Sequence, residues 1–229
     1  MSKKSVIAVI MTLVLVAMQS IAVSTHAQPS EEGNCEYTFN LNEMNTCAVN
    51  AYIAANKQLN QVLENVNSRL TSEHKIQLLE KAQRAWREFR KSYCDFAGYP
   101  VFDEPGYLFH KHDCLERITK QHLKNLEQYA AGGGILTGTS YRVEERLEES
   151  DSEVAIEEPA EERLDAVYQD VMNQLYSPVE KRWLEKAHIS WRSFRQDYCD
   201  LAVDQNGCLE RITRQQIENL ERYIEDLDV

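Results

Sequence analysis

The sequence is short of positive charge. Its 229 residues include 25 lysines and arginines against 37 aspartates and glutamates. Two of the basic residues, Lys3 and Lys4, fall in an N-terminal leader, so the remaining chain has 23 basic against 37 acidic side chains, a formal net charge of −14. Such a chain repels nucleic acids and anionic membranes, which proteins bind through lysine and arginine. It is steered towards basic partners, although net negative charge can also serve solubility alone.

The sequence also lacks the short motifs of common enzyme classes. GxSxG, HExxH, the phosphate-binding P-loop and the dinucleotide fingerprint are all absent. Carboxylates are abundant, but helix faces and one acidic stretch account for them, and no acid/base pair stands out. We therefore expect a protein that is not an enzyme, with no catalytic residue and no cofactor.

Long apolar runs are missing everywhere except near the N-terminus. Residues 1–27 have the pattern of a signal peptide, in which Lys3 and Lys4 precede an apolar run from Val6 to Met18 and Thr25-His26-Ala27 offers a cleavage site. That run is short for a bilayer-spanning helix, which needs about 20 residues. We expect an exported protein, periplasmic or secreted, with no membrane insertion after signal cleavage.

One segment of the chain is repeated. Shifting the sequence by 105 residues aligns Leu79–Ala97 with Leu184–Ala202, and 12 of these 19 positions are identical. Further along, the offset falls to 94, where Cys114–Tyr129 matches Cys208–Tyr223. The connections between the matched blocks therefore differ in length by 11 residues. Agreement of this extent indicates a duplication.

Both copies have the apolar period of amphipathic helices, with apolar residues recurring at steps of three and four. In the second copy, Ser177, Pro178 and Glu180 form a helix start with a capping box. We expect an all-α fold of two small disulfide-stapled three-helix modules, each an antiparallel bundle, joined by an acidic linker. The first module takes residues 28–134 and the truncated second module takes residues 161–229.

Residues 135–160 are expected to link the modules. Between Glu144 and Glu162 there are ten acids and one base, Arg146. So little apolar surface does not offset the entropy lost on ordering. We expect a flexible, solvated spacer; an acidic segment that docks a basic partner is the alternative.

Six cysteines in an exported protein indicate three disulfides. Sequence alone permits 15 pairings, but the repeat removes most of them, because one cysteine ends the second helix and another begins the third helix in each copy. A bridge between them staples a helix–loop–helix corner, which stabilises a loop of roughly 10 to 20 residues by on the order of 3 kcal/mol. The economical pairing is Cys35–Cys47, Cys94–Cys114 and Cys199–Cys208.

Several motifs of the first copy resemble a known family. MNxCA at residues 44–48 opens a helix, AQRAWxxFRxxxC occupies residues 82–94, and Cys114 opens the last helix. These motifs resemble the secreted bacterial proteins related to the lysozyme inhibitor LprI. The resemblance covers residues 35–129 well. In residues 160–223 it rests only on Trp191, Phe194, Arg195 and the two cysteines.

The resemblance implies an all-helical domain and, for some members, inhibition of lysozyme. A lysozyme is typically strongly basic, so electrostatic steering fits it as the partner of an acidic chain. We therefore expect an exported module that binds a basic protein partner, lysozyme being the one implied, and acts through the first copy. A structural or tethering protein of the cell envelope, without inhibitory activity, is the alternative.

The connection from Gly98 to Asp113 in the first copy is the candidate binding element. It is rich in aromatic and acidic residues and is tied at its base by the expected Cys94–Cys114 bridge, as suits an interface hot spot on a loop. The second copy has only Val203–Gly207 there. The alternative is that the aromatic side chains cover the end of the helical core. The candidate residues are Tyr99, Phe102, Asp103, Glu104, Tyr107 and Phe109.

The repeated Trp-Arg-x-Phe-Arg motif is interpreted as scaffold. Its tryptophan and phenylalanine lie at i and i+3 on one helix face, which is typical of core residues rather than of a ligand cage. The arginines, one turn past the tryptophans, are expected to form structural salt bridges with Glu116 and Glu210. The motif residues are Trp86, Phe89, Arg90, Trp191, Phe194 and Arg195.

His110-x-His112-x-Cys114 has a spacing compatible with a metal site. A cysteine in a disulfide cannot act as a thiolate ligand, and the second copy has no matching histidines. We expect no metal.

Overall fold

Every regular element that the structure describes is helical. The structure is a computed structural model that describes residues 40–133 and 159–227. The first copy forms α2 (Leu41–Arg69), α3 (Glu73–Ala97) and α4 (Tyr107–Gln128), and the second forms α5 (Ala160–Gln174), α6 (Pro178–Cys199) and α7 (Gln205–Leu227). A short 3₁₀ helix, η2 (Tyr99–Val101), follows α3, and a π turn, η3 (Tyr129–Gly133), ends α4. The expected signal peptide, Cys35 and nearly all of the expected linker lie outside the described residues.

Local sequence signals set the helix starts. The Asn40 side chain accepts a hydrogen bond from the backbone N–H of Asn42 at 2.9 Å before α2. Before α6 the Ser177 hydroxyl accepts from the backbone N–H of Val179 at 3.2 Å, with Pro178 at the first helical position. The predicted serine cap and the proline after it are thus confirmed, with the Ser177 side chain bonded to the second helical residue.

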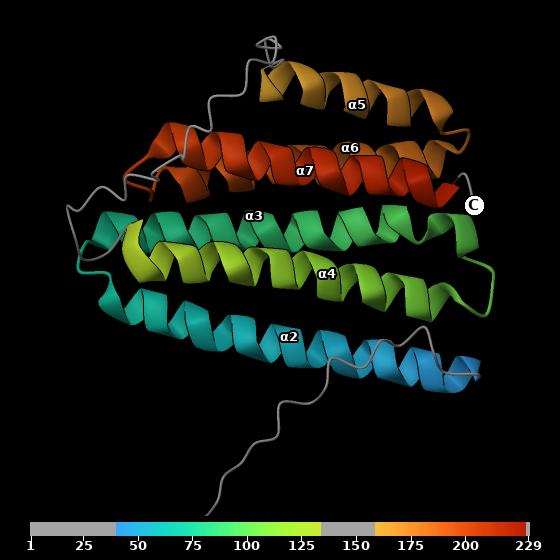
Figure 1. Ribbon diagram of the computed structural model, residues 1–229, viewed down its shortest axis with the longest axis horizontal. Coiled ribbons are helices and arrows are strands. Elements are labelled where there is room, and N and C mark those ends of the chain that lie inside the picture. The colour runs from blue at the N-terminus through green and yellow to red at the C-terminus, as the bar shows by residue number, and fades with distance from the viewer. Residues whose placement is uncertain (1–39, 134–158, 228–229) are drawn as a thin grey trace, which may run out of the picture. The chain divides into compact units, whose positions relative to one another are not determined.

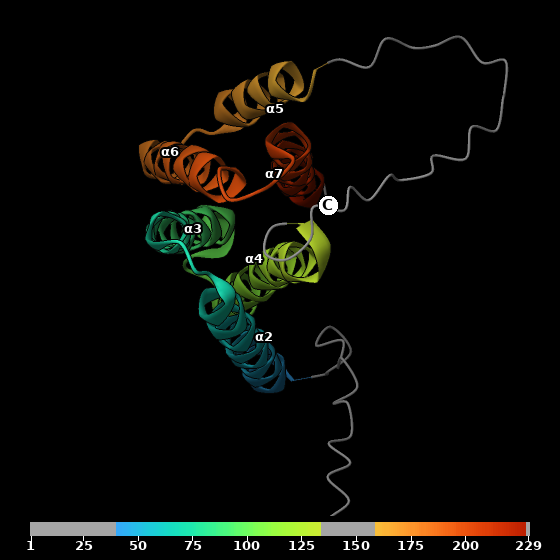
Figure 2. The same cartoon turned by 90° about the vertical axis from the view of Figure 1, so that its left-hand side faces the viewer.

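The central helices belong to different copies. The most extensive helix pairing in the described ranges joins α3 to α6, while α2 packs on α4 and α5 packs on α7. Seen along the helices, α5 lies over the α6–α7 pair, the α3–α4 pair comes next, and α2 lies on the far side (Figures 1 and 2). The helices form one compact unit. The sequence left the packing of the copies open, and the structure shows that they share one hydrophobic core.

A buried histidine illustrates this shared core. The ring of His122 in α4 stacks on Trp86 of α3, with ring centroids 4.5 Å apart. The same ring meets Phe194 and Tyr198 of α6 edge-on, at 5.1 and 5.8 Å. All four side chains are buried, so the aromatic centres of the two copies are continuous.

The contact between the copies repeats itself with the roles exchanged. The Tyr93 hydroxyl donates to the backbone carbonyl of Asn219 at 2.5 Å, and the equivalent Tyr198 hydroxyl donates to that of Asn125 at 2.7 Å. Two further sets of side-chain hydrogen bonds are exchanged in the same way. Arg117 donates to Asn219 as Arg211 does to Asn125. Asn125 donates to Gln215 as Asn219 does to Gln121. The two copies are thus related by an approximate twofold axis.

The two predicted corner disulfides are confirmed. Cys94–Cys114 and Cys199–Cys208 have Cα–Cα distances of 5.6 and 5.5 Å. Cys47 is also disulfide-bonded, while its predicted partner lies outside the described residues. One detail was wrong, because Cys114 and Cys208 do not begin their helices. Helix α4 already begins at Tyr107 and α7 at Gln205, so each bridge lies inside the first turns of its helix.

Candidate partner-binding end of the helical bundle

Both copies contribute chain to one end of the bundle. The α3–α4 connection of the first copy lies at the same end as the turn between α5 and α6 of the second, near the end of α7 (Figure 1). The Ser177 hydroxyl joins the two segments by donating to the hydroxyl of Tyr99 at 3.3 Å. We define the loop end as residues 98–109 together with residues 175–177.

The base of the α3–α4 connection is held by more than its disulfide. The Asp95 carboxylate of α3 accepts hydrogen bonds from Lys111 of α4 at 2.7 Å and from Lys91 at 2.8 Å. Burial would raise the pKa of Asp95, but the hydrogen bonds from both lysines outweigh it and the pKa lies below its ordinary value. Asp95 is therefore ionised at neutral pH and fixes the first turns of α4 against the end of α3.

The aromatic side chains of the connection form a stack that begins on the second copy. The ring of Tyr99 meets the edge of Trp183 in α6, with centroids 5.5 Å apart. Phe102 stacks on Tyr99 at 6.2 Å, and Tyr107 meets Phe102 edge-on at 5.1 Å. Tyr99 thus covers the end of the core, as the alternative interpretation of the sequence had it, while Phe102 lies on the outside of the stack.

The candidate residues differ in how far they reach solvent. Phe102 is 49% exposed, and its neighbours Asp103 and Glu104 are exposed. Tyr107 and Phe109 are half-buried because they lie on the first turn of α4 rather than on a loop. The structure therefore separates an outer trio, Phe102, Asp103 and Glu104, from three aromatic residues that also pack.

A hollow of about 400 Å³ lies between this connection and α7. Tyr93, Phe109 and Tyr223 contribute to its apolar lining, and the exposed side chains of Arg222 and Asp226 contribute its charged groups. An equivalent hollow of about 290 Å³ occurs at the other copy's disulfide corner. The second copy has no long connection to line its hollow, so the lining by the connection is found only at the loop end.

One surface residue of this end was not among the predicted candidates. Tyr176, in the turn between α5 and α6, is 96% exposed. The signal was present in the sequence, because the 105-residue offset places Tyr176 opposite Thr71, the middle residue of the corresponding turn of the first copy. A large aromatic side chain replaces a small polar one at a position where the fold buries neither.

The repeated tryptophans and phenylalanines are buried, but the arginine partners were predicted wrongly. Arg90 lies over the ring of Trp86 at 4.3 Å and donates to the hydroxyl of Thr119 at 2.8 Å and to Asn56 at 3.0 Å. Burial lowers the pKa of Arg90 from its ordinary value. Glu116 instead pairs with Lys120, one turn along its own helix. Thr119, which is buried, is the residue of this turn that faces Arg90.

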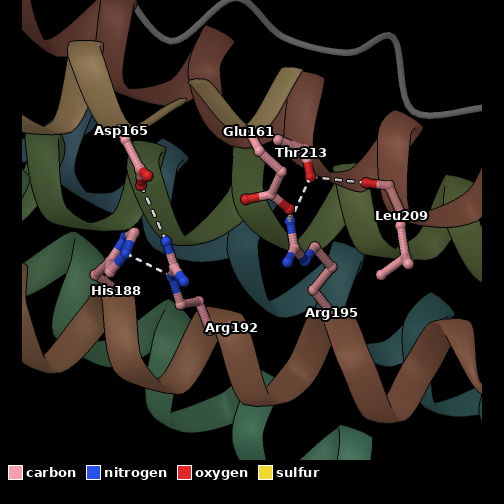
Figure 3. A network of polar contacts seen from close by, with 7 residues as sticks. All are labelled: Glu161, Asp165, His188, Arg192, Arg195, Leu209 and Thr213. Carbon is pink, nitrogen blue, oxygen red and sulfur yellow. Dashed lines mark hydrogen bonds and ion pairs between the residues drawn. The ribbon is translucent and has the colours of Figure 1, made fainter. Parts of the chain in front are cut away.

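The second copy repeats this arrangement. Arg195 bonds to Thr213 and pairs with Glu161 (Figure 3). The predicted partner Glu210 pairs with Arg214 instead. Beside them, Arg192 joins Asp165 at 3.0 Å to His188 at 2.9 Å (Figure 3). Burial, aided by the charge of Arg192, lowers the pKa of His188 to about 4. These contacts fix α5 on α6 and are structural.

The suspected metal motif is divided among other contacts. Cys114 is bonded to Cys94, and the ring Nδ1 of His112 bonds to the backbone carbonyl of Leu108 at 2.8 Å. Within residues 40–133 and 159–227 no cluster of three potential ligands could hold a metal ion. No helix within these ranges is long and apolar enough to cross a membrane.

The family described as Lysozyme inhibitor LprI matches residues 34–126 and 154–220. These two segments fall on the two copies and together cover more than half of the chain. The chain belongs to the LprI lysozyme inhibitor family. The family match is split as the tandem arrangement predicts, with a gap that contains η3 and most of the acidic stretch.

Among solved structures, this LprI family chain is similar to the crystal structure of an uncharacterized protein from Burkholderia thailandensis. The TM-score is 0.56 at 14% sequence identity, and the similarity covers 85% of this chain and 94% of that one. A match over 85% of the chain includes both copies, so this likeness concerns the paired arrangement rather than one copy alone. A comparison with curated proteins finds no match.

Proposed function

We propose that this protein is an exported inhibitor of lysozyme that binds the enzyme through residues 98–109 of the first copy and catalyses no reaction itself. The observation that carries the proposal is the outer trio on a restrained connection in a member of the LprI family. Phe102 offers an apolar side chain to a partner, and Asp103 and Glu104 flank it with negative charge. The disulfides suit an oxidising compartment, such as the periplasm or the medium.

The chemistry of the partner fits this surface. A basic enzyme is attracted by a chain with an excess of acidic residues, which raises the association rate at low salt. Lysozymes hold two catalytic carboxyl groups in a cleft. A projecting aromatic side chain on a connection fixed by Cys94–Cys114 and Asp95 enters such a cleft at little entropic cost.

The test is clearance of a cell-wall suspension by a basic c-type lysozyme in the presence of the purified chain without residues 1–27. The proposal expects clearance to slow as the chain is added and Phe102→Ser to weaken this effect while helical content stays the same. Val203→Ser is the matched control, because Val203 is 76% exposed in the short α6–α7 turn, the equivalent of the connection in the second copy. Full lytic activity at a large molar excess of the unaltered chain would falsify the proposal.

A further inference from the structure

We infer that Tyr176 of the second copy is part of the lysozyme-binding surface, so that both copies supply aromatic anchors to one partner. This inference rests on the proposed function and extends it beyond the first copy. The occupant it requires is a basic protein with a cleft, the same lysozyme.

The fold itself does not explain Tyr176. In the α2–α3 turn of the first copy, Thr71 lies between the buried Leu70 and Ser72, the N-cap residue of α3. In the α5–α6 turn, a buried Leu175 and the N-cap residue Ser177 flank Tyr176. The flanking residues are the same in both turns, and both leucines are buried, although only Ser177 caps its helix through its side chain. The middle position is exposed in both and differs, so the choice of tyrosine serves something other than the scaffold.

The backbone on both sides of Tyr176 is held by hydrogen bonds. The backbone N–H of Leu175 donates to Val171 at 3.2 Å, which ends α5, and the Ser177 carbonyl accepts from Lys181 at 3.2 Å, which begins α6. The chain is thus held on both sides of an aromatic side chain that is 96% exposed. An aromatic anchor on a restrained backbone loses little conformational entropy on binding.

Tyr176 lies beside the aromatic stack of the connection. Its neighbour Ser177 bonds to Tyr99, on which Phe102 stacks. Phe102 and Tyr176 therefore flank one contact between the copies and are the exposed aromatic side chains on its two sides. A binding surface centred on Phe102 therefore borders the turn of the second copy that carries Tyr176.

The charge of these segments favours a basic partner. Residues 98–109 contain Asp103 and Glu104 and no lysine or arginine, and residues 175–177 are uncharged. Aromatic anchors among acidic neighbours match the tyrosine-rich centres and charged rims of protein interfaces.

The experiment measures the concentration of the chain, without residues 1–27, that halves the lytic rate of a basic c-type lysozyme. Loss of a hot-spot side chain weakens binding about 30-fold, so we expect Tyr176→Ser to raise this concentration about 30-fold. Tyr176→Phe, which keeps the ring, stays within about twofold of the unaltered chain. Val203→Ser, at the opposite end, serves as the matched control and leaves the concentration unchanged.

The outcomes separate this inference from the proposed function. If Phe102→Ser weakens inhibition and Tyr176→Ser does not, the surface is confined to the first copy and the inference is overturned while the proposed function stands. If the unaltered chain leaves lysozyme fully active, both are overturned. Because Tyr176 is exposed, circular dichroism should show the same helical content in all variants, so any loss of inhibition reports on binding.

Discussion

The free energy of unfolding should fall steeply in mild acid because of His122. Its Nε2 lies 2.8 Å from the side-chain amide nitrogen of Gln83. Nδ1 has no hydrogen-bond partner among the described residues. Protonation would place a charge between Trp86 and Phe194 without a partner. Burial, with a smaller effect of the charge of Arg90, lowers the pKa of His122 to about 3.

The direction and size of the effect follow from linkage. The pKa of His122 is 6.5 in the unfolded chain and about 3 in the fold. The unfolded state therefore binds the proton first, and the contribution to stability is complete above pH 6.5 and is lost as the pH falls towards 3. Each pH unit in this window costs about 1.4 kcal/mol. At pH 4.5 the loss from this one residue is about 2.7 kcal/mol.

The test uses the residue that the second copy carries at the same place. Position 122 corresponds to Gln216, which is also buried, so His122→Gln removes the titrating ring with a side chain that the fold accepts there. Urea unfolding at pH 7.0 and 4.5, followed by circular dichroism, gives the stability lost by each protein. The unaltered chain should lose about 2 to 3 kcal/mol more than His122→Gln.

A control and a refuting result are both available. His74→Gln makes the same chemical change at an exposed position on α3, and we expect its loss of stability between the two pH values to equal that of the unaltered chain. Equal losses in the unaltered chain and in His122→Gln would show that His122 titrates normally in the fold, and the reasoning from its burial would be refuted.

Two further predictions concern the contact between the copies and the corner of the second copy. Tyr198→Phe removes one of the donors to the carbonyl of Asn125, which also accepts from the backbone N–H of Tyr129, and should lower the free energy of unfolding by about 1 kcal/mol, as should the equivalent Tyr93→Phe; urea unfolding at pH 7 measures both, and no change in either would contradict the reciprocal bonding. Replacing Cys199 and Cys208 together by serine opens a 9-residue loop and should cost about 2.6 kcal/mol, which thermal unfolding with and without reductant would show.

Much of the fold could be predicted because the chain repeats itself. The two offsets of the repeat fixed the helices, and the matched cysteines fixed both corner disulfides. The start of α4 could not be predicted from the repeat, because the second copy has no counterpart of the long connection and the two copies align again only from Cys114. Pro105 and Gly106, just before Tyr107, mark the true start.

The registers between helices could not be predicted in the same way. Glu116 and Thr119 both lie within one turn on α4, and the sequence does not say which of them faces Arg90. The charge of Glu116 suggested a salt bridge, but its side chain lies on the outer side and Thr119 is buried. Local pattern shows which face of a helix is apolar, whereas the partner across that face depends on packing.

Of the loop end, only the part in the first copy was predicted from the sequence. The aromatic and acidic composition of the connection drew attention to Phe102, which the structure leaves half-exposed. Tyr176 was overlooked because it lies 74 residues further along the chain. The packing of α6 on α3, with the contact of Ser177 and Tyr99, brings its turn to the same end of the bundle.

The exchanged pairs Tyr93–Asn219 and Tyr198–Asn125 make the contact between the copies isologous, like that of a C2 homodimer. Two identical chains joined through such a contact would carry a long connection at each end and would be bivalent. Fusing two unequal copies removes this equivalence, because the second copy turns from α6 to α7 in a few residues. The duplicated chain presents the long connection once, so under the proposed function we expect a one-to-one complex with its partner.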